Sequence, residues 1–254
     1  EKPLALQVGG SNKEELAEVA KIAEDMGYDE ININLGCPSK KVQKNKFGAC
    51  LMKEPDLVAD CINSMINACK IPVTAKTRIG FDDTEEFDYL NDFIQKMRDA
   101  GAETFILHAR KAMLSGLSPK QNLNIPKLNY KMVYDIKKEN SNLEIIINGG
   151  ITKIEEIKSH LNYCDGVMIG RSIYQNPYSL IEIEKEIFKT EKNPTREQVV
   201  EKLLEYVYKE VKLGTKVNHI MRHTVGLYHG QIGSKNWKRY LSDNMMARDS
   251  DFQK

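Results

Sequence analysis

A cation, an imidazole and two glycine-rich segments stand at the ends of four consecutive predicted strands. They are Lys76, His108, Asn148-Gly149-Gly150 and Gly170-Arg171. Glycine allows a ligand to approach the backbone closely, and the N–H groups at the start of a following helix bind phosphate. A single Gly-Gly after a strand is more often a simple turn. Two such segments on consecutive strands favour a phosphorylated ligand.

Lys76 and His108, together with Gln7 at the end of the first predicted strand, suit a planar heterocycle. A lysine near the pyrimidine end of a flavin stabilises the negative charge of the reduced ring, and an amide satisfies the polar edge of the ring. We therefore predict flavin mononucleotide (FMN) as a cofactor. Without a ligand, His108 is a hydrogen-bonded strand-end histidine and Lys76 is a surface charge.

Cys37 lies just beyond a predicted strand, in a loop that Gly36 and Pro38 make tight. A thiol in such a loop is accessible to a ligand. Cysteine thiols are mostly protonated at neutral pH, so a role as general acid suits this residue at least as well as a role as nucleophile.

The other four cysteines are expected to be small buried hydrophobic side chains: Cys50, Cys61, Cys69 and Cys164. Five cysteines without a CxxC pair predict neither a disulfide framework nor a metal site. They indicate a reducing compartment, and we expect the cytoplasm, although an organelle is also compatible.

Six short apolar runs predict buried strands, and segments with helical periodicity lie between them. The predicted strands are Leu4–Val8, Glu30–Leu35, Pro72–Arg78, Glu103–Ala109, Leu143–Asn148 and Gly166–Gly170. The predicted helices are Lys13–Met26, Pro55–Ala68, Glu85–Ala100, Tyr130–Lys138 and Ile154–Leu161. This alternation implies an α/β fold with a parallel sheet, either a (β/α) barrel or an open doubly wound sheet.

Polar or glycine residues at all six strand ends favour the barrel, because a barrel builds its active site from many strand ends. A doubly wound sheet usually carries GxGxxG after its first strand, and that motif is absent here. A TIM-type (β/α)8 barrel needs eight strands, so we expect the first two to be missing from this chain. The two glycine-rich segments would then follow strands seven and eight, where barrels commonly bind phosphate.

The apolar runs stop after the sixth strand, and helices are predicted over Thr195–Leu213 and Lys216–Gly230. Thr195 is a suitable N-cap for the first of these helices. We therefore predict a catalytic barrel domain over residues 1–193 and a small helical domain over residues 194–254.

The predicted helical domain is basic: it carries 11 Lys and Arg against 7 Asp and Glu, although the whole chain has a net charge of only +1. No acidic residue lies between Val211 and Ser242. This charge pattern suits nucleic acid, and a solvated helix surface would show the same pattern.

The composition excludes several classes of protein. The chain has 254 residues, of which 41% are hydrophobic and 29% are charged, so it is neither a disordered tail nor a collagen nor a small disulfide-rich scaffold. No run approaches the roughly 18 apolar residues that would span a bilayer. The first residues do not begin a signal peptide. We expect a soluble monomer without a membrane partner.

Six motifs at the predicted strand ends resemble those of tRNA-dihydrouridine synthases. They are Leu6-Gln7-Val8-Gly9-Gly10, Ile31-Asn32-Ile33-Asn34-Leu35-Gly36-Cys37-Pro38-Ser39, Lys76-Thr77-Arg78-Ile79-Gly80, His108-Ala109-Arg110-Lys111, Ile147-Asn148-Gly149-Gly150-Ile151 and Gly166-Val167-Met168-Ile169-Gly170-Arg171. Two further segments are most similar to the DusA subfamily: Leu114-Ser115-Gly116-Leu117-Ser118-Pro119-Lys120 and Trp237-Lys238-Arg239-Tyr240-Leu241. The resemblance spans essentially the whole chain.

The resemblance implies an FMN barrel, a helical tRNA-binding domain and NADPH as the reductant. The implied reaction saturates the C5=C6 bond of D-loop uridines at position 20 or 20a, with hydride from the flavin to C6 and a proton from Cys37 to C5. FMN contacts are implied for Gln7, Lys76, His108, Asn148, Gly149, Gly150, Gly170 and Arg171. Contacts with tRNA are implied for Asn34, which would hold the target uracil, and for Arg110, Lys111, Lys120, Lys238 and Arg239.

One segment departs from the subfamily pattern. DusA-type sequences have Asn-Arg-Glu-Ile-Pro where this chain has Asn122-Leu123-Asn124-Ile125-Pro126. Leu123 therefore removes an expected guanidinium contact with tRNA.

Two other functions fit part of the pattern. A flavin barrel that reduces a free pyrimidine, of the dihydroorotate dehydrogenase kind, would share the phosphate site and a cysteine but would not need the basic helical segment. A non-catalytic RNA-binding module would use that segment but has no need of polar groups at six strand ends.

Overall fold

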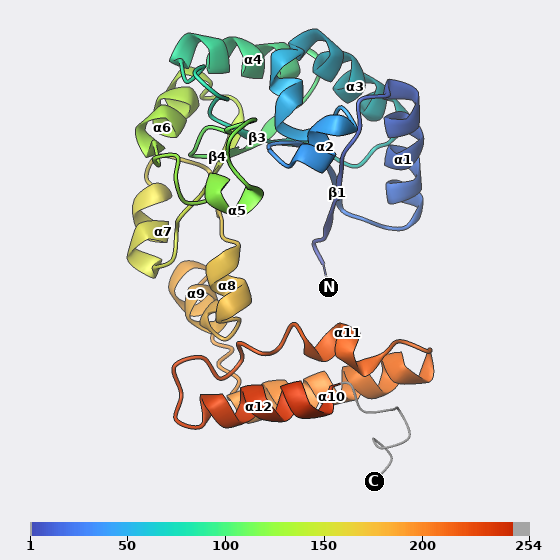
Figure 1. The fold of residues 1–254 in the computed structure, drawn as a ribbon, viewed down its shortest axis with the longest axis vertical. Helices are drawn as coiled ribbons and strands as arrows, with labels where there is room; N and C mark the ends of the chain where they lie inside the picture. Colours follow the sequence, from blue (N-terminus) through green and yellow to red (C-terminus); the bar gives the residue numbers. More distant parts are fainter. Residues whose placement is uncertain (1, 246–254) are drawn as a thin grey trace. The chain divides into compact units, whose positions relative to one another are not determined.

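The computed structural model describes residues 2–245, and its first part is a parallel sheet with helices on its outer side (Figure 1). The six strands are β1 (Ala5–Val8), β2 (Glu30–Leu35), β3 (Val73–Arg78), β4 (Thr104–His108), β5 (Glu144–Asn148) and β6 (Gly166–Met168). Each strand pairs in parallel with the next one along the chain. All six predicted strands are confirmed.

The strand order separates the two expected architectures. The order β1-β2-β3-β4-β5-β6 runs in one direction across the sheet. A doubly wound sheet reverses its order at a switch point, whereas a (β/α) barrel adds its strands consecutively. The sheet therefore has the winding of a barrel. The presence of two further βα units before this chain stays a prediction.

Helices form an arc around the outside of the strands (Figure 1). The arc consists of α1 (Lys13–Asp25), α3 (Pro55–Ala68), α4 (Phe87–Asp99), α6 (Tyr130–Glu139) and α7 (Ile154–His160). Three short helices interrupt the loops after β2 and β4: α2 (Lys40–Lys44), the 3-10 helix η1 (Gly48–Lys53) and α5 (Pro119–Asn122). The long helices follow from sequence: Asn12 caps α1 by accepting from the Glu15 amide, and Pro55 occupies the first turn of α3.

The two faces of the sheet differ sharply in chemistry. Alternate strand residues point to opposite faces, and the face toward the helices is apolar. Its fully buried side chains are Ile31, Ile33, Leu35, Ala75, Phe105, Leu107, Ile145 and Ile147. The strand register places polar residues such as Asn32, Thr74 and Lys76 on the other face. The fold therefore has its hydrophobic core between sheet and helices and a polar inner face.

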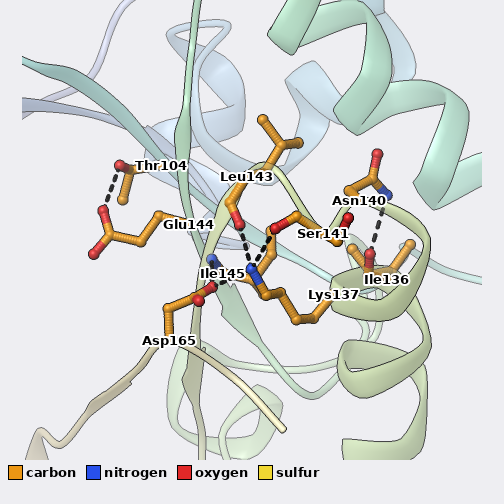
Figure 2. Close-up of polar contacts among 9 residues, drawn as sticks. All are labelled: Thr104, Ile136, Lys137, Asn140, Ser141, Leu143, Glu144, Ile145 and Asp165. Atoms are coloured by element: carbon orange, nitrogen blue, oxygen red, sulfur yellow. Dashed lines mark hydrogen bonds and ion pairs between the residues drawn. The ribbon is translucent and has the colours of Figure 1, made fainter.

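A lysine and an aspartate join the amino-terminal ends of the later strands (Figure 2). Lys137 Nζ, from α6, donates to the carbonyls of Ser141 and Leu143 at 3.0 and 2.8 Å and pairs with Asp165 Oδ2 at 2.9 Å. The same carboxylate oxygen accepts the Ile145 amide at 2.8 Å. Burial raises the pKa of Asp165, but the bonds from Lys137 and Ile145 outweigh it, so its pKa lies below the ordinary 3.8.

We expect Asp165→Asn to lower the free energy of unfolding at pH 7 by roughly 1 kcal/mol, because the pair is partly exposed and screened by solvent. A carboxylate whose folded pKa is depressed stabilises the fold above its unfolded pKa of 3.8 and loses that contribution as the pH falls through the lower folded pKa. Urea unfolding at pH 7 and pH 3 measures this. The difference between Asp165→Asn and the parent protein should shrink at the lower pH.

The control is Asp135→Asn, which removes the exposed pair with Lys131 on the same helix. That variant should keep the parent stability within a few tenths of a kcal/mol at both pH values. A loss at pH 7 that is equal in both variants would contradict the role of Asp165.

Every element that follows β6, up to residue 245, is a helix. These helices are α8 (Arg171–Gln175), α9 (Ser179–Ile187), α10 (Arg196–Lys212), α11 (Val217–Met221) and α12 (Ser234–Asn244). Thr195 caps α10 as predicted, in a capping box with Gln198. A separate small core joins α10, α11 and α12 through Val207, Val217, Met221 and Leu241.

The helix predicted over Lys216–Gly230 is wrong beyond its first turn, because α11 ends at Met221. The Thr224 carbonyl accepts the Trp237 indole N–H at 3.1 Å, and the Thr224 hydroxyl donates to the Met221 carbonyl at 2.8 Å. These bonds occupy the Met221 and Thr224 carbonyls, which in a continuing helix would accept backbone amides. A tertiary contact thus ends a segment whose sequence has helical periodicity.

The chain divides into two compact units, one formed by residues 1–151 with 155–168 and the other by residues 152–154 with 169–254. The predicted domain boundary at residues 193 and 194 lies inside the second unit and stays a prediction. No helix in the described residues is long and apolar enough to cross a membrane.

Candidate active site

The strand register brings four predicted ligand residues to one face of the sheet. Lys76 lies in register with Ile106, and Arg78, two residues on, lies opposite His108. His108 in turn pairs with Asn148, and Gln7 pairs with Asn32. Because side chains alternate along a strand, all of these point to the inner face. The predicted grouping of amide, cation and imidazole at the carboxyl ends of the strands is thus present in the first unit.

A row of hydrogen-bonded side chains crosses the inner face from β1 to β3. Asn34 Nδ2 donates to Gln7 Oε1 at 2.9 Å, and Gln7 Nε2 donates to Asn32 Oδ1 at 2.7 Å. Asn32 Nδ2 donates to the Thr74 hydroxyl at 2.7 Å, which donates to the Glu30 carboxylate. Gln7 and Asn34, which were predicted to contact different ligands, therefore belong to the same hydrogen-bonded row.

The Cys37 loop is held by the same row. Asn34 Oδ1 accepts the backbone amides of Gly36 and Cys37, both at 3.1 Å. The Cys37 carbonyl accepts the Ala49 amide at 2.9 Å, and Gly48, with φ of 77°, leaves no room for a Cβ beside that carbonyl. Cys37 is half-buried, and its backbone is fixed on both sides. The sequence therefore placed this thiol correctly in a tight loop just after β2.

Lys76 lies on the inner face and reaches toward β5. Its Nζ donates to Asn148 Oδ1 at 2.8 Å, and Asn148 Nδ2 donates to the Met168 carbonyl at 2.8 Å. Burial, and then the neighbouring Arg78 cation, lower the pKa of Lys76 from 10.5 to about 8. Asn148 therefore orients Lys76, in addition to its predicted place in the glycine-rich segment.

Arg78 is a residue of this site to which the sequence analysis gave no role. It is buried and donates to three backbone carbonyls: Nε to Gly36 at 3.1 Å, and Nη1 to Lys111 at 3.2 Å and Asn122 at 3.1 Å. The loops after β2 and β4 thus meet at one guanidinium. Burial lowers the pKa of Arg78 to about 10, so it stays charged at neutral pH.

Neither cation of β3 pairs with a carboxylate among residues 2–245. Every hydrogen bond that Lys76 and Arg78 make there goes to an amide or carbonyl oxygen. Buried charges are normally paired, because an unpaired charge loses its hydration without compensation. An anionic ligand at the inner face would supply the missing charge.

The glycine pair after β5 has a backbone that other residues adopt only with strain. Gly149 and Gly150 have φ of 119° and 71°. A Cβ at Gly149 would lie 3.0 Å from the His108 ring, and one at Gly150 would lie 2.7 Å from Leu128. Tyr130 Oη donates to the Gly149 carbonyl at 2.7 Å. The segment thus packs directly against His108 and Leu128, and this packing requires glycine at both positions.

The remaining predicted contacts are spread over several elements. Gly170 and Arg171 begin α8 in the second unit, where Lys238 and Arg239 are exposed on α12. Lys120 is exposed on α5, whereas Lys111 Nζ lies 3.8 Å from Glu85 Oε2, and Arg110 Nη1 donates to the Pro126 carbonyl. Of these cations, Lys111 and Arg110 are already engaged by neighbouring loops.

The other cysteines have structural environments. Cys61 and Cys164 are buried, and burial raises the pKa of each to about 11. Cys50 and Cys69, which were also predicted to be buried, are only half-buried and donate to carbonyls, Cys50 to Phe47 at 3.2 Å. No group of three or more His, Cys, Asp or Glu residues able to hold a metal ion lies within the described residues.

The chemistry of the inner-face residues fits both the ring and the phosphate of a flavin mononucleotide. Lys76 offers a cation of reduced pKa, which suits the negative edge of a reduced flavin ring. Gly149 and Gly150 follow β5 with positive φ values and place no side chain beside His108. Both features are those expected of a site for a planar, phosphorylated and anionic cofactor.

Comparison with known proteins identifies the family. The family model described as dihydrouridine synthase (Dus) matches residues 1–253. The chain is 50% identical to the tRNA-dihydrouridine(20/20a) synthase of Shewanella oneidensis over 96% of this chain and 73% of that protein. It is 49% identical to the protein of that name from Escherichia coli K12 over 99% of this chain and 73% of that protein, and 48% identical to the Synechocystis protein over 97% and 74%. The chain therefore belongs to the dihydrouridine synthase family and is an oxidoreductase of that type.

Proposed function

We propose that this chain reduces the C5=C6 bond of uridines in the D-loop of tRNA to 5,6-dihydrouridine, at positions 20 and 20a. The positions come from the names of relatives that are 48–50% identical over nearly the whole chain. The observation that carries the proposal is the inner face itself. It combines a half-buried thiol in a fixed loop with the half-buried Lys76 and the buried Arg78, whose hydrogen-bond partners among residues 2–245 are amide and carbonyl oxygens. That combination suits a proton donor beside an anionic cofactor.

FMN, reduced by NADPH, is the proposed cofactor and would supply the hydride that adds to C6. Gln7, Lys76 and His108 would bind its ring, and Asn148 would keep Lys76 oriented toward it. Gly149 and Gly150, with Gly170 and Arg171, would bind its phosphate.

Cys37 would give its proton to C5 of the uracil. The bonds from the Gly36 and Cys37 amides to Asn34 hold the thiol loop in place for this transfer. Asn34 Nδ2 donates one N–H to Gln7, and its second N–H, without a partner among residues 2–245, would donate to a uracil carbonyl. Asn34 would thus position both the Cys37 thiol, which gives the proton, and the uracil ring, which receives it. Because a base in the tRNA stack cannot reach such a site, the nucleotide must be turned outward.

Exposed cations would bind the tRNA backbone: Lys120 near the barrel mouth, and Lys238 and Arg239 on α12. Arg110 and Lys111, in the loop that follows β4, would line the approach to the inner face. The monomeric state and the cytoplasmic location stay predictions.

We expect Lys238→Ala and Arg239→Ala to weaken tRNA binding and to reduce the slope of log affinity against log salt by about one each. With one phosphate contact fewer, binding releases about one counterion fewer from the tRNA. Because phosphates are the same in every tRNA, the effect should not depend on the D-loop sequence. Filter binding at several salt concentrations measures the slope. Lys185→Ala on α9 is the control, and an unchanged slope in the α12 variants would contradict a phosphate contact.

The direct test is to incubate the protein with FMN, NADPH and an unmodified tRNA transcript, and then to sequence the tRNA by mass spectrometry. The expected result is the gain of two hydrogen atoms at uridine 20 or 20a. Leu123 stands where the subfamily has arginine, so the relative yield at the two positions is the informative quantity. Formation of dihydrouracil from free uracil but not from tRNA would favour a free-pyrimidine reductase, and tRNA binding without flavin binding would favour an RNA-binding protein.

A further inference from the structure

Gln43 bridges two loops that are far apart in sequence. This residue of α2 presents its amide nitrogen to two backbone carbonyls, Pro38 at 2.9 Å and Leu114 at 2.8 Å. Pro38 directly follows Cys37, and Leu114 lies in the segment after β4. Because both partners accept hydrogen bonds, the bridge uses both N–H groups of the carboxamide. One half-buried side chain therefore ties the thiol loop to the segment after β4.

The segment after β4 is itself held firmly. The Leu114 amide donates to Asp82 Oδ1 at 2.8 Å. Asn122, which is fully buried, exchanges hydrogen bonds with the Met113 backbone in both directions, at 2.7 and 3.0 Å. Leu114 is thus fixed at its amide by Asp82 and at its carbonyl by Gln43. Gln43 therefore joins the Cys37 loop to a rigid support.

We propose that Gln43 is a positioning residue, which sets the place of the Cys37 thiol by bridging the Pro38 and Leu114 carbonyls. This inference rests on the proposed role of Cys37 as proton donor. Reacting atoms must be held close to the productive geometry, and a misplacement of about 1 Å can cost 100-fold in rate. The bridge also makes the place of the thiol depend on residues 111–122, the segment in which Lys111 and Lys120 are proposed to approach tRNA.

The test compares Gln43→Glu with Gln121→Glu in the FMN-loaded protein. At Gln43 the change replaces two N–H donors with oxygen and places a carboxylate against two carbonyls. At Gln121 the side-chain oxygen accepts the Ser118 amide at 2.9 Å, and glutamate makes the same bond in a capping box. The same chemical change should therefore be damaging at one position and neutral at the other.

Two readouts are needed. The first is the rate of Cys37 alkylation by iodoacetamide without tRNA, measured by peptide mass spectrometry relative to Cys69 in the same molecule. The second is the rate at which unmodified tRNA reoxidises the reduced enzyme in a single turnover. For Gln43→Glu we expect a several-fold change in the alkylation ratio and a roughly 10- to 100-fold slower turnover. Gln121→Glu should match the parent protein in both.

Gln43→Met, which has similar size and no charge, carries the test if Gln43→Glu does not fold, and the same directions are expected. An unchanged alkylation ratio and turnover in the Gln43 variants, while Cys37→Ala is inactive, would overturn the bridge alone. Full activity of Cys37→Ala would overturn the acid role of Cys37 and, with it, the role of Gln43 in the reaction.

Discussion

Replacing Cys37 by alanine should slow tRNA reduction by roughly 100- to 10,000-fold, the contribution typical of a positioned general acid. The loop itself should keep its conformation, because Asn34 and Ala49 hold the backbone of residue 37 and not its side chain. FMN and tRNA should therefore bind to Cys37→Ala as they bind to the parent protein. Single-turnover reoxidation of the reduced enzyme by tRNA, together with flavin absorbance and tRNA filter binding, measures the three quantities.

Cys50→Ala is the matched control. Cys50 is also half-buried, but its thiol donates to the Phe47 carbonyl and belongs to the packing of η1. Its loss should leave the turnover rate within a factor of about two. Equal losses in both variants would indicate disturbed packing and contradict a specific role for the Cys37 thiol.

Replacing Lys76 by methionine should weaken FMN binding roughly 10- to 100-fold, the amount expected for one hydrogen bond to a charged group. The parent protein should also bind FMN less tightly as the pH rises through about 8, because Lys76 loses its proton there. Lys76→Met should lack this pH dependence. Titration of FMN fluorescence between pH 7 and 9.5 provides both results. Lys40→Met, at an exposed position of α2, is the control.

The lowered pKa of Lys76 also predicts how the stability of the ligand-free protein depends on pH. That stability should rise with pH, whereas FMN binding should weaken. Because the pKa of Lys76 falls from 10.5 to about 8 on folding, the unfolded chain binds the proton more tightly between these two values. Stability should therefore rise with pH across this window. If stability does not change with pH in this window, either in the parent protein or in Lys76→Met, then folding does not lower the pKa of Lys76.

The strands and the long helices of the first unit could be predicted because the spacing of their apolar residues matches the side that is buried, whereas α9 and α12 of the second unit were not predicted. Glu30–Leu35 and Pro55–Ala68 have the bounds predicted, since each is delimited by the change from apolar to polar or by proline. The short helices α2, η1 and α5 were not predicted. Four to six residues carry too little periodicity, and these turns depend on tertiary bonds such as those of Gln43 and Asn122.

The candidate site was predictable as far as its residues stand at strand ends. Gln7, Lys76, His108 and Asn148 share the inner face because each ends a parallel strand. The sequence does not indicate a role for Arg78, because its partners are backbone carbonyls, which every sequence contains. The partners of Gln43 are carbonyls too, and the same limit applies. Contacts of this kind leave no pattern in the residue types.

The hydrogen-bonded row across the inner face has a direction. Glu30 can only accept from the Thr74 hydroxyl, so that hydroxyl must accept from Asn32. Asn32 must then turn its oxygen to Gln7, and Gln7 its oxygen to Asn34. This choice leaves the Asn34 oxygen for the amides of the Cys37 loop. Glu30, at the start of β2, thus fixes the orientation of each side-chain amide in the row. Through Asn34, the conformation of the Cys37 loop at the end of β2 therefore depends on a carboxylate at the other end of the same strand.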